Sequence, residues 1–347
     1  MKRRKKVSRA SLKGYTLIEL MVAGLISIIV IYAAFDFFNN QQKVFRQQAA
    51  QARNQANLRL GLYYLAHDLM NAGYTGGPFG LEGEMYRAES AASSTPVAPV
   101  KPVDFAADPD FISLKLDNQA GHTIDGIELW LNINTSGDVT GLSAISPVGT
   151  NTLSANTVSI FQAKAPKCDM VLDSCTPFIG FAAGFIITNA DGSGEYEPIS
   201  SVDLSGKTIT AADTLKATYV NQSVVAPVWR RVYYLRDIKG TRWLVRRDYS
   251  AGPQYTDTKL AEGVSDLQVS YDMSMTASSG VPQITPEVDP DNPPPFVAPF
   301  NPKYIYSVNV NLYSAVQDAE LKKPLQTIMS RKVKIMNLGL HPKLRPW

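Results

Sequence analysis

Histidine and cysteine are scarce in this chain of 347 residues, which has three of the former and two of the latter. The sequence also lacks G-x-S-x-G, P-loop, H-E-x-x-H and zinc-type Cys/His spacings. These are the local patterns that accompany nucleophilic hydrolysis, nucleotide binding and zinc chemistry. We therefore expect no catalytic site and no resident cofactor, and we interpret the chain as a structural or binding protein rather than an enzyme.

Acidic residues are absent from the first fourteen residues, MKRRKKVSRASLKG, which hold seven of the 34 Lys and Arg residues. Without this segment 27 basic residues face 31 acidic ones, so the formal net charge changes from +3 to −4. The basic character therefore belongs to a leader over residues 1–14. This distribution argues against nucleic-acid binding by the chain as a whole.

A single long apolar run follows the basic segment. Residues 20–35 read LMVAGLISIIVIYAAF and carry no charge. A helix over residues 15–38 would be about 36 Å long, which exceeds the ~30 Å of a bilayer core. Because basic residues precede the run, the positive-inside rule predicts a cytoplasmic N-terminus and an exported remainder. A removable secretory signal fits less well, since no clean small-residue cleavage site follows.

One ionisable residue, Glu19, lies at the entrance of this apolar run. A charge at the centre of a membrane helix costs about 2.5–3.5 kcal/mol, and the cost falls toward the helix end. The carboxylate therefore suggests a binding partner without identifying one.

The order of a basic leader, Gly14, an aromatic residue, TLIEL and an unbroken apolar helix resembles the N-terminal signature of type IV prepilins and of the pseudopilins of type II secretion. The resemblance implies that a prepilin peptidase cuts after Gly14 and methylates the new N-terminus at Tyr15, where phenylalanine is commoner. It also implies that Glu19 pairs with the terminal amine of a neighbouring subunit in the filament core. Such pairing offsets the cost of a buried charge.

The helix is expected to continue through residues 39–73, which lack proline and are rich in good helix formers. Its leucines recur at helical spacing and predict one apolar face that packs on the protein's own sheet, with Gly73 as C-terminal cap; they are Leu58, Leu62, Leu65 and Leu69. The end of this segment, LAHDLMNAGYTG, resembles PilW-like minor pilins. So do three later segments in the same order, RVYYLRDIKGTRWLVRRDYS, KLAEGVSDLQVSYDM and RKVKIMNLGL.

Residues 74–347 are expected to form a β-rich head. Short runs that alternate apolar and polar residues predict antiparallel strands, namely FISLKL, IDGIELWLNI, FAAGFIIT, VWRRVYYLR, TRWLVRRDY, VSDLQVSYDM, IYSVNVNLY and IMSRKVKIMNL. Residues 76–110 and 280–302 are rich in proline and small residues and predict loop insertions; the second holds eight prolines, which exclude a central strand. The fold class is therefore α+β. By resemblance it is pilin-like, with a long N-terminal helix, transmembrane in one half and amphipathic in the other, on a mainly antiparallel sheet.

Two small motifs in the head invite comparison with known sites. Cys168 and Cys175 would lie outside the cytoplasm, where a disulfide is the natural state. The segment NADGSGEYE offers oxygen atoms at positions one, three, five and seven of an EF-hand-like loop, namely Asn189, Asp191, Ser193 and Glu195. Position twelve is a serine rather than the usual glutamate. A glycine-rich turn between two strands is therefore the stronger interpretation, and calcium binding is the weaker one.

A cluster of basic residues forms the best candidate for a binding patch, with Arg230, Arg231, Arg242, Arg246 and Arg247 as its core. If the two runs that carry them pair as strands, several of these side chains share a face beside aromatic residues. A nucleic-acid contact is one hypothesis for such a surface. The charged, solvated face of a hairpin is the commoner explanation.

The resemblance implies a minor pilin, processed by prepilin peptidase, that takes part in initiating and capping a type IV pilus. Before assembly it would be a single-pass inner-membrane protein with a periplasmic head, and afterwards part of the pilus at the cell surface, at its tip. The expected partners are other major and minor pilins, the peptidase and the inner-membrane assembly platform. The alternatives are a tip adhesin, a DNA-uptake receptor, and a J-type pseudopilin of type II secretion.

Overall fold

The computed structural model describes residues 16–73, 100–103, 126–131, 139–169, 174–190, 194–250, 255–276, 282–288, 305–316 and 325–335. The chain divides into two compact units, residues 1–52 and 53–347.

The first unit contains the N-terminal part of one α-helix, α1 (Leu17–Asn71). Its apolar side chains are exposed, and an 18-residue window with a mean hydropathy of 2.4 has no buried residue. The helix is long and apolar enough to span a membrane, as the sequence predicts.

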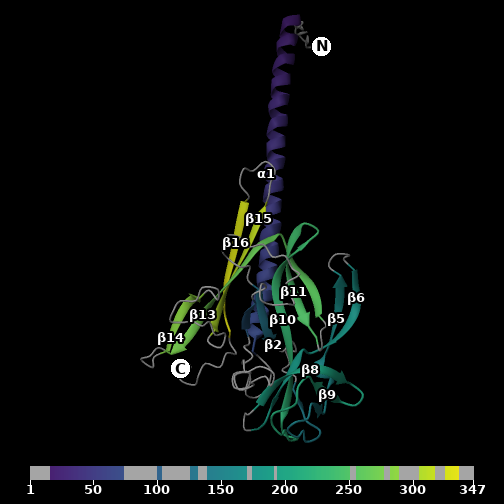
Figure 1. Cartoon of the computed structure of the whole chain (residues 1–347). Helices are drawn as coiled ribbons and strands as arrows, with labels where there is room; N and C mark the ends of the chain where they lie inside the picture. Colours follow the sequence, from purple (N-terminus) through teal and green to yellow (C-terminus); the bar gives the residue numbers. More distant parts are fainter. Residues whose placement is uncertain are drawn as a thin grey trace, which may run out of the picture. The chain divides into compact units, whose positions relative to one another are not determined.

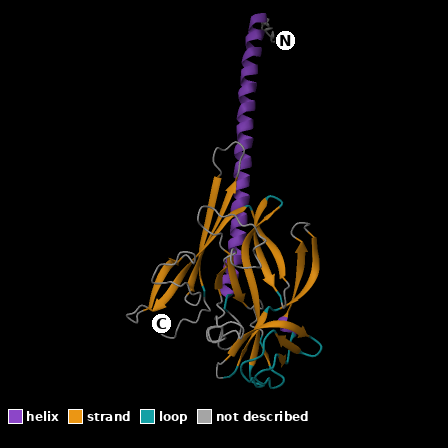
Figure 2. Ribbon diagram, in the orientation of Figure 1, coloured by secondary structure: helices purple, strands orange, loops and turns teal. Residues whose placement is uncertain are grey.

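The second unit is built mainly from antiparallel strands (Figures 1 and 2). The largest sheet has the order β1 (Val100–Val103), β2 (Gly126–Leu131), β10 (Val224–Ile238), β7 (Gly184–Thr188), β8 (Gly194–Asp203), β9 (Thr208–Ala211) and β4 (Thr152–Ser154). Three more strands join it at or beyond β10, namely β3 (Thr140–Gly141), β11 (Thr241–Tyr249) and β12 (Tyr255–Glu262). The long β10 therefore connects two groups of strands.

Two smaller sheets complete this unit. One has the order β14 (Pro282–Val288), β13 (Val264–Thr276), β15 (Ile305–Val316) and β16 (Leu325–Lys334). The other is the pair β5 (Gln162–Asp169) and β6 (Ser174–Phe181), preceded by the 3-10 helix η1 (Ser159–Phe161). One long helix and these antiparallel sheets make the fold α+β, which confirms the predicted class.

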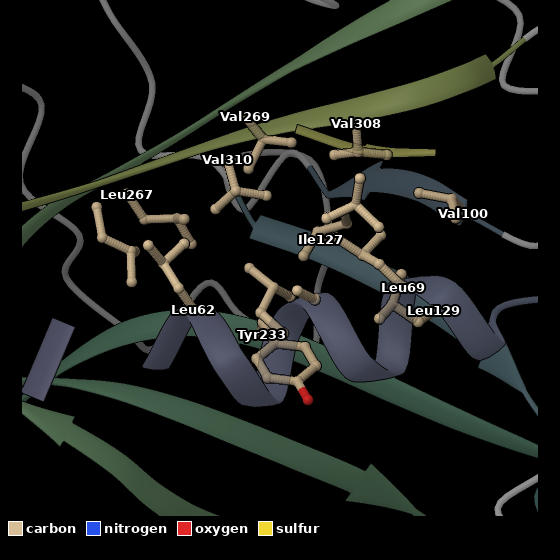
Figure 3. Packing of buried hydrophobic residues seen from close by; sticks show 14 of the residues in the cluster. Leu62, Leu69, Val100, Ile127, Leu129, Tyr233, Leu267, Val269, Val308 and Val310 are labelled. Atoms are coloured by element: carbon tan, nitrogen blue, oxygen red, sulfur yellow. The ribbon is translucent and has the colours of Figure 1, made fainter. Parts of the chain in front are cut away.

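The leucine stripe of α1 lies in the main core, as predicted. Leu58, Leu65 and Leu69 are fully buried and Leu62 nearly so. They pack with apolar side chains of the ten-stranded and the four-stranded sheet. These side chains include Ile127, Leu129, Tyr233, Leu244, Leu267, Val308 and Val310. Figure 3 shows this stretch of the helix between the strands that carry those residues. Burial on two sides explains why the stripe is apolar at every helical turn.

Gly61 lets α1 approach both sheets closely. A Cβ atom there would lie 2.9 Å from Leu244 Cδ2, 3.2 Å from Ala261 Cβ and 3.2 Å from Leu312 Cδ1. We expect Gly61→Leu to lower the free energy of unfolding by about 2 kcal/mol, because an extra side chain overpacks this contact. Chemical denaturation of the full chain in detergent would measure it. The control is Ala56→Leu at an exposed position of the same helix, which should leave stability almost unchanged; equal losses would contradict the packing explanation.

Most predicted strands are present. Seven of the eight predicted runs coincide with strands, and the bounds of β11 are those of TRWLVRRDY; FISLKL, at residues 111–116, lies outside the described residues. In β15 the predicted face of Val308, Val310 and Leu312 is buried.

The two segments predicted as loop insertions are not loops throughout. Within 76–110 the structure has β1, and within 280–302 it has β14. Both strands lie at the ends of their sheets. Proline is tolerated there because an edge residue need not donate its N–H to the ladder. The sequence correctly excludes a central strand, but an edge strand satisfies the same constraint.

Candidate functional sites in the apolar helix and the arginine clusters

Glu19 caps the N-terminus of α1 through reciprocal hydrogen bonds with Thr16. The Thr16 backbone N–H and hydroxyl donate to Glu19 Oε2 at 3.0 and 3.1 Å, and the Glu19 N–H donates to Thr16 Oγ1 at 3.3 Å. This is a capping box, and the T-x-x-E pattern in the sequence specifies it. The carboxylate thus has a role within its own chain. Pairing with a neighbour's amine remains a prediction, and Gly14 and Tyr15 lie outside the described residues.

The register of β10 and β11 divides the predicted arginine patch between two faces. Arg231 lies opposite Asp248, Tyr233 opposite Arg246, and Asp237 opposite Arg242. Opposite residues share a face and successive residues alternate. Arg231, Arg242 and Arg246 therefore lie on one face, and Arg230 and Arg247 lie on the other.

On the first face, five side chains form a network that we call the Asp68 network. Asp68 of α1 accepts hydrogen bonds from Arg231 Nη1, at 2.8 Å, and from the Tyr233 hydroxyl. Arg231 Nε donates to Asp248 Oδ1 at 2.6 Å, and Arg246 Nε donates to Asp248 Oδ2 at 3.0 Å. Asp68, Arg231 and Tyr233 are buried. The network ties the C-terminal part of the helix to the sheet by charge as well as by apolar contact.

The protonation states in this network follow from burial and from the neighbouring charges. Burial alone lowers the pKa of Arg231, but the carboxylates of Asp248 and Asp68 outweigh it and raise that pKa. Burial and the Asp68 carboxylate both raise the pKa of Tyr233 well above its ordinary value. Arg231 is therefore charged and Tyr233 neutral, so that both act as hydrogen-bond donors.

On the opposite face, Asp257 accepts hydrogen bonds from a second group of side chains. Arg247 donates through Nε and Nη2 to its two oxygens at 2.8 and 2.9 Å, and the Tyr234 hydroxyl donates at 3.1 Å. The Arg247 guanidinium also lies 3.8 Å from the centre of the Tyr255 ring. A planar guanidinium suits this combination of a bidentate carboxylate and a stacked ring.

Every arginine of the predicted patch has a partner in the protein. Arg230 binds Glu128 at 2.8 and 3.2 Å, and Arg242 donates to the Ser265 carbonyl at 2.7 Å. Arg231, Arg246 and Arg247 bind the aspartates described above. These contacts neutralise most of the positive charge locally, and they favour a structural role over contact with phosphates.

The oxygen atoms of the calcium candidate that the structure describes are already engaged. Asn189 Oδ1 accepts from the Ser223 hydroxyl at 2.6 Å, and both Glu195 oxygens accept from the Lys216 N–H at 3.1 and 3.0 Å. Asp191 and Ser193 lie outside the described residues. Within the described ranges, no group of three or more His, Cys, Asp or Glu side chains is placed to hold a metal ion.

The backbone places the two cysteines opposite each other in the β5–β6 pair. Opposed residues of antiparallel strands have Cα atoms about 4.5–5.5 Å apart, within the range that a disulfide spans. The register is therefore compatible with the predicted bond between Cys168 and Cys175, which remains a prediction.

Two further buried carboxylates were not predicted from the sequence, and the first of them is Asp272. It accepts hydrogen bonds from the Ser307 hydroxyl, from Asn309 Nδ2 at 3.1 Å and from the Glu287 N–H at 3.1 Å, and it pairs with Lys332 Nζ at 2.5 Å. Burial raises its pKa, but these donors outweigh burial, so the pKa lies below its ordinary value. Asp272 links all four strands of its sheet.

The second missed carboxylate is Glu197 of β8. It is fully buried, and neither of its oxygens has a hydrogen-bond partner among the described residues. Burial, followed by the charges of Glu195 and Asp213, raises its pKa to about 7, and Lys216 only partly opposes this. Its strand neighbour across the ladder is Phe185. Only the strand register reveals that this glutamate faces an apolar core.

Comparison with models of known protein families found no match for this chain, and a search of curated proteins also found none.

Proposed function

We propose that this chain is a minor pilin that is anchored in the inner membrane by α1 and assembles through that helix into a type IV pilus, whose assembly it helps to initiate and whose tip it caps. One observation carries the proposal. The N-terminal part of α1 exposes its apolar residues on all sides, whereas its later leucine stripe is buried in a β-rich unit. Such an exposed apolar helix requires cover from lipid or from other subunits.

The proposal assigns successive roles to the N-terminal residues. The Lys and Arg residues of the segment 1–14 hold the N-terminus in the cytoplasm until prepilin peptidase cuts after Gly14 and methylates Tyr15. Glu19, at the first turn of the helix, then pairs with the amine of a neighbouring pilin, and the assembly platform draws the helix into the filament. The second unit stays outside the membrane, where an oxidised Cys168–Cys175 pair would close the β5–β6 hairpin.

Mass spectrometry of the mature N-terminus tests the processing step. In cells with an active prepilin peptidase, we expect a chain that begins with N-methylated Tyr15. An intact leader, or cleavage at another position, would exclude the assignment. Restoration of piliation, but not of type II secretion, in the corresponding deletion strains would separate a pilin from a J-type pseudopilin.

Two substitutions at Glu19 separate its role in the cap from its proposed role between subunits. Glu19→Gln keeps a capping side chain at this position, but it cannot pair electrostatically with an amine. Glu19→Val removes both functions. We expect both variants to be inserted in the membrane and both to be largely absent from sheared filaments, as judged by immunoblotting. Normal incorporation of Glu19→Gln would show that the cap, rather than the charge, is what assembly requires.

A further inference from the structure

The strand β16 forms an open edge of its sheet. It pairs along its whole length with β15, from Val316 opposite Leu325 to Ser307 opposite Lys334. In the described part of the chain no strand pairs with its other side. Because alternate residues of an antiparallel strand direct their N–H and C=O groups away from the partner, about half of these backbone groups are available for another strand.

A groove runs between this edge and α1. Its volume is about 560 Å³, and its lining is mainly apolar, with Ala56, Leu60, Leu62 and Tyr63 from the helix and Ser330 from β16. Leu60 is 45% exposed and Tyr63 is 59% exposed. Apolar side chains next to unpaired backbone groups are the combination that recognises an extended peptide by strand addition.

Two arginines, Arg59 of α1 and Arg331 of β16, also line the groove. Arg331 lies opposite the buried Val310, which places it on the helix-facing side of the sheet. Neither arginine has an ion pair among the residues that the structure describes, in contrast to those of β10 and β11. The groove therefore presents positive charge that the described residues do not neutralise.

The charges on β16 also indicate which partner fits. Two copies of this strand that pair antiparallel in a register centred on Lys332 would bring Arg331, Lys332 and Lys334 close to the same residues of the other copy, and like charges across paired strands are destabilising. An acidic partner strand would instead gain from Arg331, the one of these three side chains that lies on the groove side of the strand. Pairing between two copies of β16 is thus disfavoured.

We propose that β16 and the adjoining groove bind an extended, acidic and apolar segment of another protein, which adds as a strand beyond β16. A carboxylate of that segment lies between Arg59 and Arg331, and its apolar side chains cover Leu60 and Tyr63. The inference concerns the second unit alone and does not depend on the function proposed for α1.

Fluorescence anisotropy with synthetic peptides tests the proposal on the full chain in detergent micelles. The probe is a labelled peptide of about ten residues, long enough to pair with β16, with alternating threonines on one face and valines and two aspartates on the other. We expect this peptide to bind. Replacing its aspartates with lysine, or its threonines with proline to remove the backbone donors, should weaken binding by about tenfold or more.

Charge reversal in the protein completes the test. The double variant Arg59→Glu with Arg331→Glu should bind the lysine peptide and no longer bind the aspartate peptide. A misfolded variant could not show this reversal of preference. Lys334→Glu, a change on the opposite face of the same strand, should leave the preference unchanged. Hydrogen exchange should show new protection in residues 325–334 and not in the other edge strand, β14.

Three results of the peptide experiments would overturn the proposal. They are equal binding of the two charged peptides, protection confined to strands other than β16, and loss of peptide binding in Lys334→Glu but not in the double variant. Binding of the groove to anionic phosphatidylglycerol vesicles, with no binding of the aspartate peptide, would identify a lipid contact and would also overturn it.

Discussion

Replacing Asp68 with alanine is expected to lower the free energy of unfolding of the second unit by about 3–5 kcal/mol, the usual cost of breaking a buried ion pair. The change leaves Arg231 buried with one carboxylate instead of two, and it removes the Asp68 hydrogen bond of the Tyr233 hydroxyl, which keeps the Tyr64 carbonyl, at 3.4 Å, as an acceptor. Chemical denaturation of the full chain in detergent, followed by tryptophan fluorescence, measures the loss. Because Asp68 lies on α1 and its partners lie on β10, the variant should also make the end of the helix more accessible to proteases.

Asp237 provides the matched control. It also pairs with an arginine, Arg242, but at 3.5 Å and with 56% of its side chain exposed. Exposed pairs contribute about 0–1 kcal/mol, so Asp237→Ala should have little effect. The double variant Asp68→Leu with Arg231→Met should recover part of the lost stability, because no buried guanidinium then remains that has lost one of its two carboxylates. Equal effects of Asp68→Ala and Asp237→Ala would show that burial of the Asp68 network is unimportant.

The parts of the fold that depend on local spacing could be predicted from the sequence. The leucines of α1 recur at helical intervals, and the apolar residues of β15 alternate, so each pattern indicates both the element and its buried face. Strands β8 and β12 could not be recognised in this way. Their buried positions include charged or polar residues, among them Glu195, Glu197 and Asp257, and these hide the alternation on which the prediction relies.

The hydrogen-bond partners of the charged residues could not be predicted from local sequence patterns. Asp68 and Arg231 are 163 positions apart, and no spacing rule connects them. The arginines of β10 and β11 could be recognised as a cluster, but not divided between two faces or matched to Asp248 and Asp257, because these matches depend on register and on distant strands. The positive charge that suggested a ligand is used to hold the sheet and the helix together.

Glu19 illustrates the opposite case, in which a local signal was available and not used. Thr16 and Glu19 have the spacing of a capping box, and the structure shows the reciprocal contacts. A cap explains why a carboxylate at the start of an apolar helix is tolerated within one chain. It is also compatible with a later exchange of partners, because the contact lies on the exposed surface of the first turn.

Glu197 should make the stability of the second unit depend on pH. Its pKa rises from an ordinary value of 4.5 to about 7 in the folded protein, so between these values the folded state holds a proton that the unfolded state has released. The contribution to stability is therefore complete below pH ~4.5, falls as the pH rises toward 7, and is lost above it. A shift of this size corresponds to about 3 kcal/mol.

Glu197→Gln isolates this contribution, because glutamine has the shape of the protonated acid and does not titrate. We expect the variant to match the wild type near pH 5 and to be more stable by about 3 kcal/mol at pH 8, where the wild type must bury a charge without a partner. Denaturation curves at both pH values give the comparison, and taking the difference between proteins removes the titration of other groups. Glu262→Gln, at an exposed end of β12, should follow the wild type at both values. If the curves for Glu197→Gln and the wild type remain parallel from pH 5 to pH 8, the carboxylate does not change its protonation state in this range, and the expected pH dependence is wrong.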